Sequence, residues 1–375
     1  MAQSISEAMP RSGIAAGKRE FPYDRWMESQ GLPIHRGFYI EDQRELELAW
    51  WPLRECNTAF VQLMGMEGVN ELRVSEIAPG KTLPPFKLGV DEIVYVLEGR
   101  GLTTVWSGEG RAKKTFEWQK YSMFMIPRHY HHQLCNTQGD RPVKLMHYNY
   151  LPVALSATED PEFFFNNSFT VPESADSGLG NLYAEAKVMT DTGGTMGARN
   201  VWYGNFFPDM RAWDRLDPFK GRGAGGHVVW IQFAGSEASC HMSVFPAKTY
   251  KKGHRHGPGR AIVIPTGEGY SVMWPEGGEK VVVPWHEASL FTPPNRWFHQ
   301  HFNVAGVPGR YLALHPLPQF SGHAEKVEDR AKDQIEYPDE ELWIRQKFEE
   351  ELAKRSLKSM MPDEAYRDKN FEWTY

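Results

Sequence analysis

Histidines recur at short, regular spacing in two segments of the sequence, KKGHRHGPGR at residues 251–260 and TPPNRWFHQHFN at residues 292–303. His254 and His256 are two residues apart, so on a β-strand both rings point to the same face. The glycines of 267–269 are typical of a turn, after which a returning strand would bring His299 beside that pair. The pattern predicts three imidazoles around one metal ion on a small β-barrel.

These segments resemble the two motifs of the cupin superfamily. The first motif has His-x-His, then a glutamate and a glycine, and the second has a proline, a glycine, a histidine and an asparagine. The positions that match are His254, His256 and Gly267 in the first motif and Pro294, His299 and Asn303 in the second. The departures are Lys248 and Arg296 at motif glycines and Arg260 at the position of the usual glutamate ligand.

An earlier stretch of the sequence repeats this pattern of residues. Gly99 aligns with Gly267 at an offset of 168 residues (267 − 99), and Trp106 aligns with Trp274 at the same offset. Further matches at nearly the same offset are Pro127 with Pro294, His132 with His299 and Asn136 with Asn303. Short strands at regular spacing with glycine turns favour a sandwich or barrel. We therefore predict an all-β bicupin, with two jelly-roll barrels, short flanking helices and a C-terminal helix.

The repeat also divides the chain. We expect an N-terminal arm and lead-in at 1–45, with residues 1–18 disordered because they are rich in Ser, Ala and Gly. A first barrel at 46–152 and a second at 227–318 would be joined by a connection at 153–226. Residues 319–375 would hold a C-terminal helix and a tail, since acids at 339–341 are typical of a helix start.

The offset places Phe86 and Leu88 at the positions of His254 and His256 in the first copy, so we expect that barrel to have lost its metal. One alternative keeps a second site there, made by Glu92, His132 and His147. In the second copy the alternative to metal binding is a set of core histidines satisfied by hydrogen bonds.

The metal prediction is one divalent ion per chain, held by His254, His256 and His299. Neutral imidazole suits Fe, Mn, Ni, Zn and Cu alike, so the ligands do not select the metal. Three ligands on one face leave coordination positions open, which is the plan of a catalytic site. We favour Fe(II) because the arrangement also resembles that of the gentisate-type ring-cleaving bicupins.

Other residues are candidates around the metal. Arg260 shares strand parity with the histidine pair and would bind a carboxylate with two parallel hydrogen bonds, unless Pro258-Gly259 turns it to solvent. His301 is a candidate catalytic acid–base group, a fourth ligand or a partner of a ligand. Trp297 and Trp274 are candidate substrate-binding residues, and His315 falls on the last barrel strand.

The net charge and the cysteine content indicate which kinds of partner and compartment to expect. The net charge is −6 and the pI about 6.2, which indicates neither nucleic acid nor an anionic membrane as a partner. The three cysteines, Cys56, Cys135 and Cys240, imply no disulfide framework, so we expect a cytoplasmic protein. A homodimer or homotetramer is expected.

The arrangement is similar to the gentisate-type ring-cleaving bicupins, which use three histidines without the glutamate, although their metal lies in the first barrel. The resemblance implies a non-haem Fe(II) dioxygenase that binds dioxygen and a small acidic, aromatic or other carboxylate-bearing substrate. The alternatives are a redox-neutral isomerase, lyase or decarboxylase, and a non-catalytic binder of a small metabolite.

Overall fold

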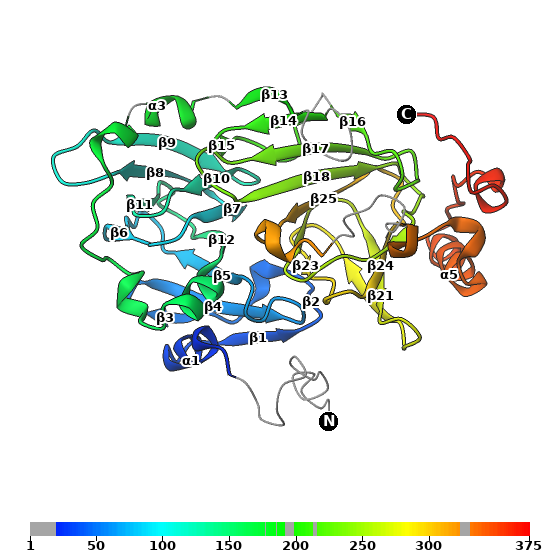
Figure 1. Cartoon of the computed structure of the whole chain (residues 1–375), viewed down its shortest axis with the longest axis horizontal. Helices are drawn as coiled ribbons and strands as arrows, with labels where there is room; N and C mark the ends of the chain where they lie inside the picture. The colour runs from blue at the N-terminus through cyan, green and yellow to red at the C-terminus, as the bar shows by residue number, and fades with distance from the viewer. Residues whose placement is uncertain (1–19, 177, 185, 192–198, 213–215, 323–330) are drawn as a thin grey trace.

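The computed structural model describes residues 20–176, 178–184, 186–191, 199–212, 216–322 and 331–375. The predicted disordered arm at 1–18 lies outside these residues. Figure 1 shows two β-barrels packed against each other, with the N-terminal half of the chain in blue to cyan and the C-terminal half in green to yellow.

The first barrel consists of two facing sheets. The larger sheet has the order β1 (Ile34–Gly37), β4 (Cys56–Leu63), β5 (Glu71–Ile77), β12 (Val143–Asn149), β7 (Glu92–Glu98), β10 (Met123–Ile126) and β15 (Phe206–Phe207), with β3 (Ala49–Trp51) paired to β4. The smaller sheet has the order β6 (Phe86–Lys87), β11 (His131–Asn136), β8 (Arg100–Trp106) and β9 (Lys114–Gln119).

The second barrel repeats this plan. Its larger sheet has the order β13 (Lys187–Asp191), β14 (Arg199–Tyr203), β17 (His227–Gln232), β18 (Ser239–Phe245), β25 (Gly309–Leu314), β20 (Ala261–Thr266), β23 (Leu290–Phe291) and β2 (Tyr39–Ile40), with β16 (Asp217–Pro218) paired to β17. Its smaller sheet has the order β22 (Val281–Trp285), β21 (Gly269–Trp274), β24 (Phe298–Asn303), β19 (Gly253–His254) and β26 (Gln334–Ile335).

Both barrels have the strand order of a jelly roll. If the strands from β18 to β25 are lettered B to I along the chain, one sheet reads B-I-D-G and the other C-H-E-F. The strands from β5 to β12 give the same two orders in the first barrel. Two interleaved Greek keys of this kind define the jelly roll, so the predicted all-β, two-barrel fold is confirmed by strand pairing.

A glycine at the same point of each barrel explains why the repeat can be recognised in the sequence. A Cβ on Gly269 would collide with the carbonyl oxygen of Phe302 and the ring of Trp285. In the first barrel, a Cβ on Gly101 would collide with the carbonyl oxygen of Cys135 and the ring of Trp118. Close packing of a tryptophan over the strand that follows the turn therefore requires glycine in both copies.

The barrels exchange short strands. β2, which precedes the first barrel in the chain, pairs with β23 of the second barrel. β15, which lies within the stretch that we predict as a connection, pairs with β10 of the first barrel. The larger sheets also begin alike, because β1 runs parallel to β4 and β14 runs parallel to β17. Each barrel is thus completed by a segment that precedes the other one.

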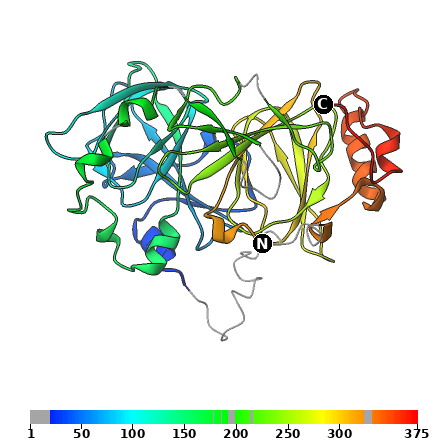
Figure 2. The ribbon, with the colours of Figure 1, turned by 45° about the horizontal axis from the view of Figure 1, so that its top comes forward.

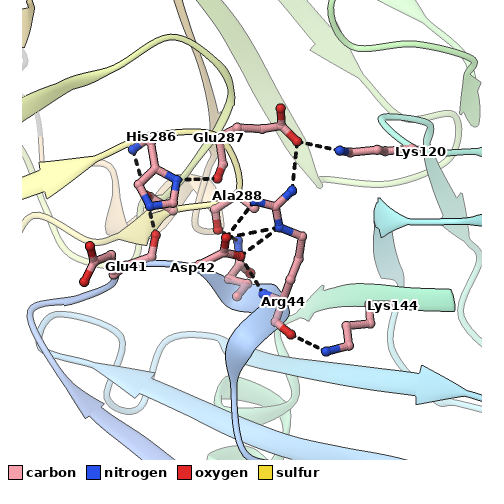
Figure 3. A network of polar contacts seen from close by, with 10 residues as sticks. Glu41, Asp42, Arg44, Lys120, Lys144, His286, Glu287 and Ala288 are labelled. Atoms are coloured by element: carbon pink, nitrogen blue, oxygen red, sulfur yellow. Dashed lines mark hydrogen bonds and ion pairs between the residues drawn. The ribbon is translucent and has the colours of Figure 1, made fainter. Parts of the chain in front are cut away.

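A polar network holds the exchanged N-terminal segment in place (Figure 3). The Arg44 guanidinium contacts Asp42 and also Glu287 of the second barrel, at 3.1 Å. Glu287 in turn accepts a contact of 2.6 Å from Lys120 of the first barrel. Arg211 and Asp209 form the matching pair in the other exchanged segment, where Arg211 lies 3.6 Å above the ring of Tyr121.

Apolar packing joins the barrels and covers the outside of the second one. A continuous core runs from Met146 and Tyr148 of the first barrel to Met242 and Leu312 of the second. The helix α5 (Leu342–Ala353) packs Phe348 against the outer face of the smaller sheet of the second barrel, at the edge of the molecule in Figure 2. The shorter helices are α1 (Pro22–Ser29), α2 (Leu151–Ala157) and α3 (Leu179–Leu182). In the described part of the chain, every helix is too short or too polar to cross a bilayer.

Candidate metal centre

The three predicted ligands lie together inside the second barrel. His254 on β19 is paired in register with His299 on β24, and their ring centroids are 4.2 Å apart. The ring of His256 lies 4.6 Å from that of His299. One nitrogen from each ring lies within 4.8 Å of the other two, and all three residues are buried.

Backbone carbonyls orient the three rings. Nδ1 lies within hydrogen-bonding distance of the carbonyl oxygen of Lys252 for His254 (3.2 Å), of Gly257 for His256 (2.8 Å) and of Trp297 for His299 (3.2 Å). A carbonyl only accepts, so each Nδ1 carries the proton and donates it. The lone pair of each ring is then on Nε2, the nitrogen that would bind a metal, and the carbonyls fix the orientation of the rings.

The rings are also in the protonation state that metals need. Burial, followed by the charge of Arg222, holds the pKa of His254 well below its usual value. Burial lowers the pKa of His299 to about 3. Neutral imidazoles bind divalent metals without first losing a proton, so the donor set fits a divalent ion.

The triad lines a cavity of about 370 Å³. Further residues that line it are Arg222, Trp230, His241, Arg260, His301 and Tyr311. Arg260 precedes β20 and shares the parity of Ile262, which also lines the cavity, so the strand directs both side chains inward. The cavity is large enough for a small organic acid beside a metal.

The cavity is electropositive because the carboxylates in its wall are already paired with cations while further arginines remain in the wall. Asp333 contacts Arg255 at 3.0 Å and also Arg296, and Glu336 contacts Lys252. Arg222 and Arg260 add two more guanidinium groups to the wall. Burial, followed by the charge of Arg222, lowers the pKa of Arg260 to about 10, so it stays protonated at neutral pH beside another cation. Such a surrounding favours an anion.

His301 lies next to His299 but outside the group of three histidines. Its ring centroid is 5.5 Å from that of His299, but it is not a member of the cluster whose nitrogens lie within 4.8 Å of one another. Nδ1 of His301 lies 2.8 Å from Oγ of Ser271, which accepts a hydrogen bond of 3.1 Å from Nε1 of Trp285. This contact holds the ring while the residue lines the cavity.

The two predicted tryptophans lie elsewhere. Trp274 on β21 points to the outer face of the sheet, where it stacks on Phe298 at 5.8 Å in the core that α5 covers. Trp297 is half-buried and packs on Phe38 at 5.7 Å, while its carbonyl holds His299. Neither is among the described residues that line the metal cavity.

Residues that the sequence reasoning missed complete the cavity. His241 projects inward from β18 and Arg222 from the loop before β17. Lys251 is fully buried, contacts Oγ of Ser243, and lies 3.2 Å from the hydroxyl of Tyr311. A signal for His241 was the alternation of the strand that it occupies, which places it on the same face as Ser243 and Phe245.

In the first barrel an arginine lies where the second barrel has its histidine triad. Phe86 is paired with His132 as His254 is paired with His299. Nη2 of Arg54 lies 3.1 Å from Nε2 of His132, and the guanidinium carbon lies 3.7 Å above the ring of Phe86. Arg54 and Phe86 are both buried. The fixed cation and the phenylalanine thus fill this end of the barrel.

The alternative site of Glu92, His132 and His147 is engaged in other contacts. Glu92 contacts Arg73, and its second oxygen lies 3.1 Å from Nδ1 of His147. Nε2 of His147 lies 2.7 Å from Oγ of Ser75. Among the described residues, this trio does not form a cluster of ligand atoms within 4.8 Å.

No protein-family model matches the sequence, and no curated protein sequence matches it. Solved structures with a similar fold include Lactobacillus farciminis oxalate decarboxylase in a formate complex, with 12% identity, a TM-score of 0.46 and coverage of 76% of this chain and 87% of that one. Oxalate decarboxylase from Bacillus subtilis has 10% identity, a TM-score of 0.44 and coverage of 76% and 78%. The coconut allergen cocosin has 14% identity, a TM-score of 0.43 and coverage of 74% and 84%.

Similarity at these levels carries no activity over to this chain. The fold rests on the chain's own strand order, which is that of a jelly roll in each half, and on the cupin-like histidine motifs on β19 and β24. The chain therefore folds as two jelly-roll barrels in one polypeptide, and its histidine motifs resemble those of the cupin superfamily.

Proposed function

We propose that the second barrel is the active site of a metal-dependent enzyme that acts on a small carboxylate-bearing substrate. The proposed reaction is oxygenation by dioxygen with Fe(II) as the metal. The observation that carries the proposal is the set of three pre-oriented imidazoles, His254, His256 and His299, in a cavity whose wall also holds arginine.

The ligand set supports an acidic substrate. Three neutral imidazoles leave the full double charge of a divalent ion uncompensated, because a guanidinium, Arg260, takes the place of the usual cupin glutamate. A carboxylate would restore neutrality, and arginine holds a carboxylate in a defined orientation through paired hydrogen bonds. Arg260 and Arg222 would therefore bind and orient the acid group.

The remaining cavity residues would control water and protons. Bound Fe(II) would supply the one-electron chemistry that dioxygen needs. Trp230 and Tyr311 provide an aromatic wall that limits access of water to the substrate, and His301, held by Ser271, presents a neutral ring for proton transfer.

A redox-neutral reaction is the second candidate. It is favoured by the nitrogen bases near the triad, since His301 and His241 both line the cavity and both have a pKa held well below its usual value, first by burial. An isomerase, lyase or decarboxylase would use the metal as a Lewis acid and one of these rings to move a proton.

The test is anaerobic preparation of the metal-free chain, loading with Fe(II), Mn(II), Ni(II), Zn(II) or Cu(II), and incubation with a panel of small aromatic and aliphatic carboxylates. Oxygen uptake that matches substrate loss only with Fe(II) supports the dioxygenase. Substrate loss without oxygen uptake supports the redox-neutral reaction. Full metal occupancy with no turnover of any acid, together with saturable binding of one of them, contradicts both and indicates a metabolite-binding protein.

A further inference from the structure

A chain of hydrogen-bonding groups runs from the metal cavity along one face of the larger sheet of the second barrel, between the strands β18 and β25. Nδ1 of His241 lies 2.7 Å from Nε2 of His315, and Nδ1 of His315 lies 3.2 Å from Oγ of Ser239. His241 lines the cavity, while His315 and Ser239 are half-buried. The order from inside to outside is therefore His241, His315, Ser239.

We propose that His241 is an acid–base group of the metal cavity and that His315 and Ser239 form a proton relay that positions and recharges it. The inference deepens the proposed function, and its catalytic part rests on that function. The juxtaposition that carries it is an imidazole in the cavity wall whose nitrogen away from the cavity, Nδ1, is engaged by a second imidazole.

The geometry leaves one ring nitrogen of His241 for a substrate. Its Nδ1 is taken by His315, and aromatic rings pack around it, those of Trp230 at 5.1 Å, Tyr311 at 5.8 Å and Phe219 at 6.0 Å. Nε2 is the nitrogen at the cavity end of the relay. Because these neighbours are aromatic rings and a second histidine, the orientation of His241 is fixed without a carboxylate.

The charges nearby explain why a second histidine is used instead of a carboxylate. Burial is the main reason why the pKa of His241 lies well below its usual value, and the nearby charges of Arg260, Lys251, Arg222 and Arg199 lower it further. An imidazolium is therefore disfavoured at this position. A pair of neutral imidazoles can give or accept a proton at one end by changing tautomers together, without a lasting charge on either ring.

The proton balance is complete with water as the only further reactant. When a substrate takes the Nε2 proton of His241, Nδ1 of His241 takes the Nε2 proton of His315. Nδ1 of His315 then takes the hydroxyl proton of Ser239, and solvent water returns a proton to Ser239. Acceptance of a proton from the substrate runs the same steps in reverse, so the pair serves as acid or as base.

The first barrel offers an internal contrast at the same strand positions. Glu71, Arg73 and Asn149 stand there in place of Ser239, His241 and His315, and Asn149 donates a 3.0 Å hydrogen bond to Glu71. Arg73 contacts Glu71 and Glu92 in a buried ion-pair network. Guanidinium and amide groups do not exchange protons near neutral pH, so that set serves structure. Histidines replace it only in the barrel that keeps the metal triad.

The direct test is the tautomeric state of the two rings. Histidine labelled with 15N would be observed by long-range proton–nitrogen correlation in the full chain loaded with Zn(II), which is diamagnetic, with assignment by single substitution. We expect both rings to be neutral at pH 7 and the tautomer balance of His241 to change in His315→Asn. The control is His35→Asn, at a residue of β1 in the first barrel, which should leave the His241 signals in place. A charged His241 at pH 7, or a His241 signal that ignores His315→Asn, overturns the relay.

The catalytic part is tested with whichever carboxylate the metal-loaded chain turns over. We expect His315→Asn to lower kcat about 100-fold, with KM changed less and metal content kept. Ser239→Ala should lower kcat and Ser239→Thr should restore it, because threonine keeps the hydroxyl. Unchanged kcat in both His315→Asn and Ser239→Ala overturns the relay. If the tautomers are coupled but the chain turns over no acid, the histidine pair is supported and the proposed reaction is refuted. If the chain turns over an acid but the tautomers are not coupled, the reaction is supported and the relay is refuted.

Discussion

Phe86 faces His132 across two antiparallel strands in the same register in which His254 faces His299. The first barrel therefore has a phenylalanine at the position of His254, a predicted metal ligand, and Phe86 is 4% exposed. It packs edge-on against the His132 ring at 5.8 Å. A packed aromatic ring thus takes the place of a predicted ligand, so the two barrels differ at this position although their folds are alike.

The packing role of Phe86 predicts a stability cost without a change in metal content. Phe86→Ala should lower the free energy of unfolding by about 3–5 kcal/mol, the usual range for a buried phenylalanine. Denaturant unfolding and elemental analysis of the same samples would measure both quantities. Phe163→Ala, at an exposed phenylalanine, is the matched control and should cost little. A cost below about 1 kcal/mol for Phe86→Ala would show that the ring is not part of the core.

Arg54 predicts that histidines alone will not restore a metal to the first barrel. In Phe86→His with Leu88→His, the Arg54 guanidinium would still lie against Nε2 of His132, and burial lowers its pKa only to about 10, so it keeps its charge. We expect one metal per chain in this double variant, and a second metal only when Arg54→Ala is added. Circular dichroism would check folding of each variant. Two metals in the double variant would show that Arg54 does not exclude the ion.

Arg260 should separate substrate binding from metal binding. Arg260→Lys keeps the charge but loses the forked donor, so KM for the carboxylate should rise about tenfold, which corresponds to a loss of about 1.4 kcal/mol, while metal content stays the same. Arg260→Glu should tighten metal binding and abolish turnover, because a carboxylate ligand then opposes the acid. Arg128→Lys, in an exposed ion pair of the first barrel, is the control. An unchanged KM in Arg260→Lys would remove the main reason for an acidic substrate.

Glu340 predicts a pH dependence of stability. Burial raises the pKa of this carboxyl to about 7, and it contacts the hydroxyl of Tyr250 and accepts a 3.2 Å hydrogen bond from Gln300. Its ordinary pKa is 4.5, so between about pH 4.5 and 7 the unfolded chain ionises first and stability is lost as pH rises. Glu340→Gln should therefore raise Tm at pH 8 more than at pH 4.5.

Thermal unfolding of the wild type, Glu340→Gln and Glu341→Gln at several pH values would measure this effect. Glu341 is an exposed neighbour whose carboxylate lies 2.7 Å from Lys280, so its variant controls for the loss of one surface charge. An equal gain in Tm for Glu340→Gln at pH 4.5 and pH 8 would contradict the raised pKa.

The fold and the grouping of the three histidines could be predicted from the sequence because both depend on local spacing. The His-x-His pair, the glycine turn and the returning histidine determine β19, β21 and β24, and the offset of the repeat located the first barrel. The strand exchange was not readable, because β2 and β15 are two residues long and carry no period. Their pairing is decided by contacts between distant parts of the chain.

The other cavity residues could be predicted only by knowing which face of each strand points into the barrel. Both faces of β21 are buried, since α5 covers the outer one, so the sequence could not tell that Trp274 lies outward. His241 is a lone histidine in its strand, and Arg222 comes from a loop. Only the closed barrel brings these residues beside the triad.

Metal stoichiometry is the measurement that tests the central claim most directly. The account places one divalent ion per chain on His254, His256 and His299 and none in the first barrel. Elemental analysis of the purified wild type should give one metal per chain, and His254→Ala with His256→Ala should give none while the protein stays folded. Two metals per chain in the wild type, or one metal retained in that double variant, would contradict the account.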